Sequence, residues 1–438
     1  MVYKINRSFL ALIALALYLS ACTTVTSPTP TLPTRPPATA KVVPTMIFTP
    51  LPEPTFTPNV PVPTYTLAST PTFPPELMQY RCLDVTQGFP PGNNTNGTIY
   101  VGVGPGPGPQ PSDVYKIDLE AKSLLTSSEY DEYASSPNGL WLAIYHAITD
   151  QTGLIVDAEI RIESSDGERI ATYSWESNWK GFHWLDNNQL IIYYKPDIYY
   201  LFSVKVVNPF TGEQHELIPD YPDVNRVANP NHPFYPIPNP SLTRVAYPLA
   251  NTRESAWVLW DLTSGQALAS LSEGISFVEV PAWSPDGRQF VVDLYTGGML
   301  VNEFYSVSWD GQQITQLTHF GNYTLEGMSV RIQTFSWSPD GRYIAFWVAV
   351  DPSPYSGERL AILDKTTLEV TNYCVHGSDW VFEGGAMSPI WSPNSQQLVV
   401  ESYDAEGYVH TVLVDIIHDF AYNIADSVRP SAWTIDQP

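Results

Sequence analysis

The sequence predicts an all-β fold built from repeated four-stranded units. Three observations lead to this prediction. First, 13% of the 438 residues are aromatic and only 15% are charged, so most of the chain can bury a core. Second, a short turn motif of Ser, Pro, Asp and Gly recurs at intervals of about 51 residues, a period typical of repeat architectures. Third, each copy leads into alternating apolar residues, which indicate a strand, and helical periodicity is almost absent.

The charge balance excludes one class of function. The chain carries 45 acidic and 21 basic residues, which gives a formal net charge of −24 and an isoelectric point of about 4.5. Phosphate backbones and anionic lipid surfaces repel such a protein. We therefore expect no nucleic-acid partner.

Residues 1–21 have the pattern of an export signal. Lys4 and Arg7 precede an apolar run from Phe9 to Leu19. This run is too short to cross a bilayer comfortably as a mature helix, and its charged start is typical of a signal peptide.

The apolar run ends in the letters LSAC, of which the last is Cys22. This ending resembles the lipobox of bacterial lipoprotein signals. The resemblance implies that residues 1–21 are removed and that a lipid is attached to the Cys22 thiol. It also implies an exported protein that is anchored to a cell-envelope membrane and faces outside the cytoplasm. The alternatives are an ordinary secretory signal and an N-terminal anchor helix.

Residues 22–75 are predicted to be a linker. The stretch from Thr23 to Pro75 contains 15 Pro and 15 Thr. Proline fixes φ and lacks an N–H donor, so the tract favours extended polyproline II and cannot form a packed core. We expect a disordered stalk that holds a domain of residues 76–438 away from the membrane.

Six copies of the turn motif mark the repeats of that domain. The three plain copies are WSPDGRQFVV from Trp283, WSPDGRYIAF from Trp337 and WSPNSQQLVV from Trp391. The three weaker copies are SSPNGLWLAI from Ser135, HWLDNNQLII from His183 and PNPSLTRVAY from Pro238. Further turns of the kind that joins antiparallel strands follow acidic residues at Asp118, Asp261, Asp364 and Asp415.

The motif and the apolar strand after it resemble the TolB-type, WD-repeat-like β-propeller family over residues 97–436. The resemblance implies that the WSPDG motif ends the innermost strand of a blade. It does not imply any particular activity. The copies at Ser135 and Pro238 lack the Trp and the copy at His183 lacks both Ser and Pro, so these blades depart from the pattern.

The two ends of the domain are expected to complete one blade together. Residues 97–126 supply three strands without a first strand, and residues 429–436 supply a first strand without followers. Their pairing would close the ring and remove exposed sheet edges. This predicts a seven-bladed β-propeller, with six blades as the alternative if one weak copy is an insertion.

Cys82 and Cys374 remain once Cys22 is lipidated. An oxidising exterior would allow a disulfide between them, and two buried thiols are the alternative.

The sequence contains no catalytic, cofactor-binding or metal-binding motif that we recognise. Asp286, Asp340 and Asn394 recur in the motif, but residues of this kind are typical of turns. The eight histidines are scattered and show no HExxH spacing, and neither a CxxC motif nor a G-x-S-x-G elbow is present. We therefore expect no cofactor and no metal.

Long loops on the face opposite the turn motifs are rich in aromatic residues. Exposed aromatic side chains in loops often take part in recognition, although packing between loops is the alternative. The candidate binding rim consists of Tyr221, Phe234, Tyr235, Tyr323, Tyr355, Trp380 and Phe382.

These observations together predict a membrane-anchored lipoprotein that acts as a binding or scaffold module for a protein or glycan ligand. The alternative is a carbohydrate-active hydrolase or lyase that works through carboxylates at the channel mouth. Two facing carboxylates about 5–10 Å apart beside a basic group would indicate the enzyme.

Overall fold

The computed structural model describes the chain between residues 78 and 435, with gaps. The described ranges are 78–90, 96–102, 114–127, 131–149, 155–176, 179–194, 203–217, 236–250, 255–271, 282–296, 301–322, 329–351, 357–378, 387–404 and 406–435. The chain divides into two units, Met1–Pro63 and Thr64–Pro438, and every described residue belongs to the second. In these ranges, no helix is long and apolar enough to cross a membrane.

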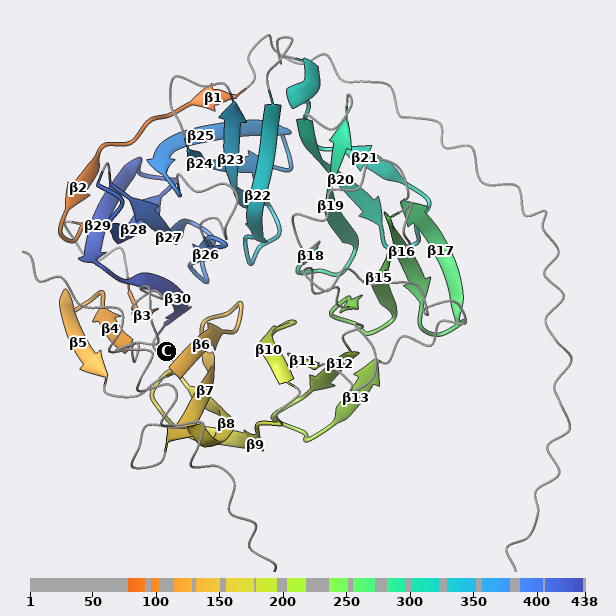
Figure 1. The fold of residues 1–438 in the computed structure, drawn as a ribbon, viewed down its shortest axis with the longest axis horizontal. Helices are drawn as coiled ribbons and strands as arrows, with labels where there is room; N and C mark the ends of the chain where they lie inside the picture. Colours follow the sequence, from red (N-terminus) through yellow and green to blue (C-terminus); the bar gives the residue numbers. More distant parts are fainter. Residues whose placement is uncertain are drawn as a thin grey trace, which may run out of the picture. The chain divides into compact units, whose positions relative to one another are not determined.

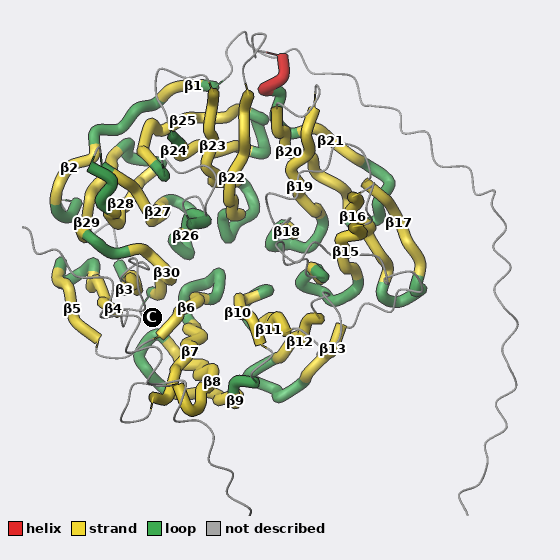
Figure 2. The backbone as a smooth tube through the Cα atoms, in the orientation of Figure 1, coloured by secondary structure: helices red, strands yellow, loops and turns green. Residues whose placement is uncertain are grey.

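The described residues form an all-β fold, which confirms the predicted fold class. The one helical segment among them is the single 3-10 turn η1 (Phe320–Asn322), drawn in red in Figure 2. Most strands belong to antiparallel groups of four that follow one another along the chain and pair in chain order.

Six groups of this kind occur in the described part of the chain, in the following order. They comprise β6 (Asp131–Ser135), β7 (Trp141–Thr149), β8 (Ile155–Ser164) and β9 (Arg169–Ser174); β10 (Trp179–Trp184), β11 (Leu190–Tyr194), β12 (Ser203–Val207) and β13 (Gln214–Leu217); β14 (Ile237–Pro238), β15 (Arg244–Ala250), β16 (Ser255–Asp261) and β17 (Gln266–Leu271); β18 (Ala282–Trp283), β19 (Gln289–Thr296), β20 (Val301–Ser308) and β21 (Ile314–Gln316); β22 (Ser329–Trp337), β23 (Tyr343–Asp351), β24 (Glu358–Asp364) and β25 (Glu369–His376); and β26 (Ile390–Trp391), β27 (Gln397–Tyr403), β28 (Val409–Asp415) and β29 (Phe420–Asp426).

A further sheet joins the two ends of the described chain. It contains β30 (Arg429–Thr434), β3 (Thr98–Gly102), β4 (Val114–Asp118) and β5 (Ser123–Ser127), in that order. β30 pairs antiparallel with β3, and Ile99 lies opposite Trp433. The sequence predicts this pairing of the two ends.

The sheets of this unit lie around a common centre, with the first strand of each group innermost (Figure 1). Neighbouring groups are distinct sheets, except that a single parallel bridge between Val301 and Val330 links β20 to β22. Such a radial succession of four-stranded antiparallel sheets is the architecture of a β-propeller.

The turn motif holds the hairpin between the first two strands of a group. The Ser284 hydroxyl donates to the Asp286 carboxylate over 2.6 Å and accepts the Gln289 N–H over 3.0 Å. Ser338 bonds Asp340 and Tyr343 in the same way. These hydrogen bonds agree with the interpretation of the repeated acidic residues as turn residues.

Glycine ends the turn because the backbone there is left-handed. Gly287 has a φ of 67° and Gly341 a φ of 71°. In the copy from Trp391, Ser395 adopts the same conformation with a φ of 61°. A side chain at this position is strained, and glycine avoids that strain.

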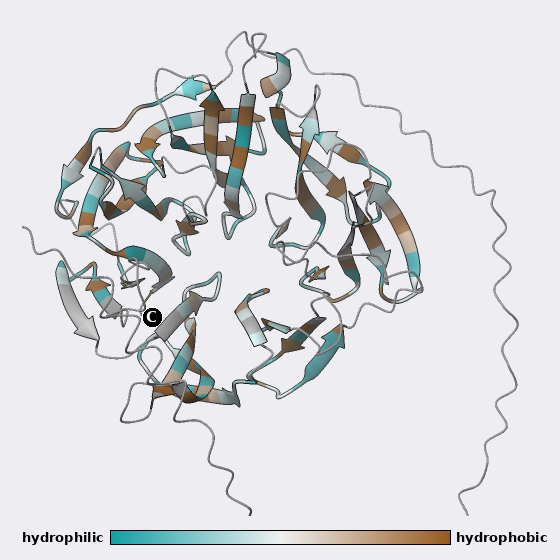
Figure 3. Ribbon diagram, viewed as in Figure 1, coloured by the Kyte–Doolittle hydropathy of each residue, from teal (hydrophilic) through white to brown (hydrophobic). Residues whose placement is uncertain are grey.

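The hydrophobic core lies between neighbouring sheets. Hydrophobic and hydrophilic residues alternate along strands such as β17 and β22 (Figure 3). The buried indoles of the motif connect adjacent groups, since the N–H of Trp283 donates to the Ile237 carbonyl over 2.8 Å and that of Trp391 to the Ser336 carbonyl over 3.3 Å. The sequence predicts this core position for these two tryptophans.

Residues 78–90 form a strap across two groups. Within the strap, β1 (Gln79–Tyr80) pairs parallel with β25, and β2 (Val85–Gln87) pairs parallel with β29. At its start, the Met78 side chain is 3% exposed and belongs to the core cluster that contains Phe304 and Phe346. The strap therefore covers the outer edges of two neighbouring sheets.

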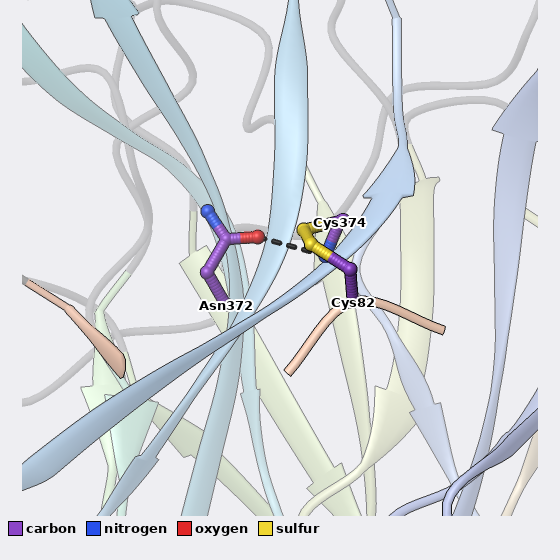
Figure 4. The surroundings of a disulfide bond; sticks show 3 residues. All are labelled: Cys82, Asn372 and Cys374. Atoms are coloured by element: carbon purple, nitrogen blue, oxygen red, sulfur yellow. Dashed lines mark hydrogen bonds between the residues drawn. A yellow bond between two sulfur atoms is a disulfide. The ribbon is translucent and has the colours of Figure 1, made fainter. Parts of the chain in front are cut away.

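A disulfide between Cys82 and Cys374 fastens the strap to β25 (Figure 4), and the two Cα atoms are 4.7 Å apart. The N–H of Cys374 donates to the Asn372 side-chain oxygen over 2.8 Å. The Arg81 guanidinium also pairs with the Asp419 carboxylate beside β29. The strap is thus held by a covalent bond and an ion pair as well as by strand pairing.

Candidate functional site

A cavity of about 500 Å³ lies where the inner strands of six groups meet. This volume is within the range of small-molecule sites in proteins. Its walls come from β6, β10, β14, β18, β22 and β26 and from the turns that follow several of them. The prolines of the turn motif contribute to the lining at Pro137, Pro240, Pro285 and Pro339.

His183 gives this apolar wall a titratable side chain. It precedes Trp184 in a motif copy that departs from the consensus. In the structure Trp184 is the counterpart of Trp283, since each donates its indole N–H to a carbonyl of the preceding group. The counterparts of His183 are therefore small or apolar residues, namely Ala134, Ile237, Ala282, Ser336 and Ile390. His183 lines the cavity and its residue surface is exposed. The sequence alone does not single out His183, because the repeat copies set it opposite the tryptophan of the motif.

Tyr193 of β11 lies beside His183. A hydrogen bond of 2.9 Å joins its hydroxyl to His183 Nδ1, and the two ring centres are 5.2 Å apart. Tyr193 is 9% exposed and also lines the cavity. The tyrosine therefore fixes the orientation of the imidazole at the cavity wall.

Burial lowers the pKa of His183 to about 4. Protein atoms around the cavity replace part of the bulk water near the ring, which disfavours its charged form. The imidazole is consequently neutral at neutral pH.

The turn after His183 is rebuilt without the usual serine. The Asp186 carboxylate accepts the Asn188 N–H over 2.7 Å and the Gln189 side-chain amide over 2.8 Å. That amide also donates to the Pro240 carbonyl, and the Asn187 side-chain oxygen accepts the Asn138 N–H over 2.8 Å. Hydrogen bonds to both neighbouring groups thus compensate for the lost motif residues.

The described lining of the cavity contains no pair of facing carboxylates. Among the described residues, Asp186 is the only acidic one that lines the cavity, and no lysine or arginine lines it. Two buried carboxylates elsewhere are engaged locally, since Glu303 accepts the Thr318 hydroxyl over 2.6 Å and Asp415 accepts the Gln397 amide over 2.7 Å. The geometry expected of a carboxylate pair in a glycosidase is therefore absent from this lining.

A partly buried charged cluster joins β27 to β30. Glu401 is 1% exposed, and one of its oxygens is 3.1 Å from Arg429 Nε. The Tyr403 hydroxyl donates to Glu401 and accepts from Arg429 over 3.0 Å. Burial, together with the Glu401 carboxylate, raises the pKa of Tyr403 to about 12, so its hydroxyl keeps its proton. The cluster holds β30 in place and contains one carboxylate.

Most predicted site residues lie outside the described part of the chain. This applies to Cys22 and to all members of the candidate binding rim, which are Tyr221, Phe234, Tyr235, Tyr323, Tyr355, Trp380 and Phe382. Within the described ranges, no group of three or more His, Cys, Asp or Glu side chains is placed to hold a metal ion.

No protein-family model and no curated protein matches the sequence. Among solved structures, TolB from Acinetobacter baumannii is similar at 14% identity and a TM-score of 0.40, over 74% of this chain and 79% of that one. The β-propeller domain of the Trilobed protease from Pyrococcus furiosus is similar at 12% identity and a TM-score of 0.45, over 72% and 87%. An oligogalacturonate lyase in complex with manganese is similar at 14% identity and a TM-score of 0.45, over 67% and 76%.

Proposed function

We propose that this chain is a membrane-anchored binding module whose ligand occupies the central cavity. The observation that carries the proposal is the cavity itself, because it is largely apolar, is open to solvent at His183, and has one carboxylate in its described lining. Ligand sites typically combine an apolar wall with a few placed polar groups. An enzyme that cleaves glycosidic bonds with two carboxylates needs a different lining.

The rest of the proposal concerns the fold of the domain and the location of the protein in the cell. The turn motifs and the pairing of β30 with β3 support a TolB-like propeller of seven blades. The LSAC sequence and the Pro/Thr tract support an exported lipoprotein on a stalk. The candidate partner is a protein or a glycan of the cell envelope, held at the cavity or at the aromatic rim.

The anchor is tested with Cys22→Ser. The thiol that would carry the lipid is then absent, so the protein should move from the membrane fraction to the soluble fraction after cell breakage. Fractionation followed by immunoblotting measures this change. Retention of the variant in the membrane fraction would show that lipid on Cys22 is not the anchor.

The binding role is tested with Ala282→Phe, which places a ring in the cavity wall. Full-length protein and this variant are used to capture components of cell-envelope extract, with Ala121→Phe on an exposed turn as the matched control. We expect a component that the wild type and the control retain and the cavity variant loses at least tenfold. Equal capture by all three, or a polysaccharide-cleaving activity that only the cavity variant lacks, would contradict the proposal.

A further inference from the structure

The disulfide between Cys82 and Cys374 joins the exposed strap to a strand of the propeller. We propose that this bond is a redox latch: a dithiol reductant opens it in the folded protein, and residues 78–82 then leave the outer edge of β25. The folded domain would thus have a closed form and an open form of the strap.

Few noncovalent contacts hold residues 78–82. Both residues of β1 are exposed, and the side chains of the Arg81–Asp419 ion pair are 49% and 39% exposed, so the pair contributes little. The Arg81 N–H donates to the Asn372 carbonyl over 2.8 Å, and Met78 is the only buried residue of the five. Ordering five residues costs conformational entropy that these contacts do not offset. The disulfide therefore keeps this part of the strap in place.

The second part of the strap, residues 83–90, has more contacts with the propeller. Leu83 and Phe89 are partly buried, and each packs against a cluster of buried core residues. The three residues of β2 pair with β29, and the Gly88 N–H donates to the Asn423 carbonyl over 3.0 Å. We therefore expect the opening to end at about Leu83, while β2 stays on β29.

Cys374 is held in place without the strap. It lies at a bulge of β25, where the pairing with β24 shifts between Arg359 and Ala361. Its φ is 60°, and its N–H donates to the Asn372 side-chain oxygen over 2.8 Å (Figure 4). A bulge changes the direction of a side chain, and these contacts lie within β24 and β25. The Cys374 thiol thus keeps its position when the bond is open, and the bond can form again.

The opening step is a thiol–disulfide exchange. One thiolate of the reductant attacks a sulfur of the bond, which forms a mixed disulfide and releases the other cysteine as a thiolate. The second thiol of the reductant then displaces the remaining protein sulfur. The reductant becomes a disulfide, and its two electrons and two protons pass to the two protein thiols. Cys82 is exposed and Cys374 is partly buried, so a small dithiol can reach the bond from solvent.

Opening changes the outer edge of β25. In the closed form, β1 pairs with this edge at Thr371 and Asn372. When residues 78–82 leave, the backbone groups of the edge lose these partners, and an uncovered edge can pair with another strand. The latch therefore controls whether this edge is covered.

Trypsin cleavage after Arg81 measures the open form. A protease cleaves backbone that has opened locally, and the Arg81 N–H is paired in the closed strap. Every sample is full-length protein with Cys22→Ser, so that Cys82 and Cys374 are its only cysteines. The oxidised protein is compared with Cys374→Ser, which removes the bond and leaves the peptide after Arg81 unchanged. Cleavage after Arg359, inside β24, reports unfolding of the blade.

The rate at each bond is divided into the rate for a short peptide of the same sequence, which gives a protection factor. In Cys374→Ser, we expect the protection factor at Arg81 to be at least tenfold lower than in the oxidised protein. It should also be at least tenfold lower than the factor at Arg359 in the same variant. Mass spectrometry of the fragments measures these rates.

Two further samples test whether the latch opens and closes. Oxidised protein that is treated with dithiothreitol under native conditions, alkylated with iodoacetamide and freed of reagents should match Cys374→Ser. Protein that is reduced and then reoxidised should regain its resistance at Arg81. Cys374→Ser that receives the same reagents is the control for their other effects.

Three results would overturn the latch. An unchanged protection factor at Arg81 would show that the strap stays on β25 without the bond. Equal protection at Arg81 and Arg359 in Cys374→Ser would show that the bond holds the whole blade. A failure of dithiothreitol to produce free thiols in the folded protein would show that reductants do not reach the bond.

Circular dichroism shows whether each sample is folded. If Cys374→Ser is not folded, the reduced and alkylated protein provides the comparison. If neither is folded, the bond is required for the fold, and the latch is refuted as well. No ligand and no lipid anchor affects these rates, so a failure of the latch and a failure of the proposed function are distinguishable.

Discussion

At the scale of single residues, the repeat motif and its exceptions have different roles. Ser284 and Asp286 hold a turn through the hydrogen bonds expected of their residue types. Because those bonds are local, sequence analysis could predict that the recurring acidic residues stabilise turns and do not act in catalysis. His183 lies in a copy of the motif that departs from the consensus, and its importance depends on which side chains other parts of the chain bring to the cavity.

His183 gives a pH prediction. Its pKa in the folded state is below the ordinary value of 6.5, so between about pH 6.5 and 4 the unfolded chain binds a proton that the folded chain does not. Stability should therefore fall as the pH decreases through this window. One proton gives a slope of at most about 1.4 kcal/mol per pH unit, and solvent in the cavity makes the real slope smaller.

The measurement compares the pH dependence of unfolding in the wild type and His183→Phe. Chemical denaturation at pH 7.5 and pH 4.5 should show a smaller loss of stability in the variant. The carboxylates titrate equally in both proteins, so the difference isolates His183. An unchanged slope in His183→Phe would contradict the lowered pKa of His183.

At the scale of elements, the sequence predicts the strands in which apolar residues alternate next to a turn motif. It does not predict strands that are too short to show such alternation. The strands after the turn motifs show alternating apolar residues, and the motif itself marks where each strand begins. The pairing of β30 with β3 was predictable because each end of the domain supplies an incomplete blade. The strap could not be predicted. β1 and β2 contain two and three residues, too few for any periodicity, and only the edges of β25 and β29 place them.

The strap also changes how the sheet edges are protected. An outer strand with unpaired backbone groups can pair with another chain, and natural proteins cover or disrupt such edges. β1 and β2 cover β25 and β29, and the Arg81–Asp419 ion pair lies at the same border. The residues between the linker and the first blade therefore belong to the folded domain. Their amino-acid composition does not reveal that they pair with the outer strands.

At the scale of the whole molecule, the cavity in the described residues differs from the binding site that the sequence predicts. Sequence analysis assigned the binding rim to loops opposite the turn motifs, and those loops lie outside the described residues. The described cavity lies instead beside the turns, where their prolines form part of its wall. A wall assembled from six repeats has no signature in any one of them, so the sequence could predict the repeats but not the cavity.

The disulfide gives a prediction for the stability of the whole domain. Cys82 and Cys374 are separated by 292 positions, so their bond closes a loop that contains most of the propeller. Such a crosslink restricts the unfolded chain, and native disulfides typically contribute about 2–4 kcal/mol. We expect Cys82→Ser, Cys374→Ser and the double variant each to lose stability by this amount, as measured by chemical denaturation of the oxidised proteins.

The three losses should be equal because one substitution already breaks the bond, and a reductant should lower the stability of the wild type to the same level. Additive losses from the two single variants, or a wild type that reductant leaves unchanged, would mean that the cysteines contribute through packing and not through the crosslink.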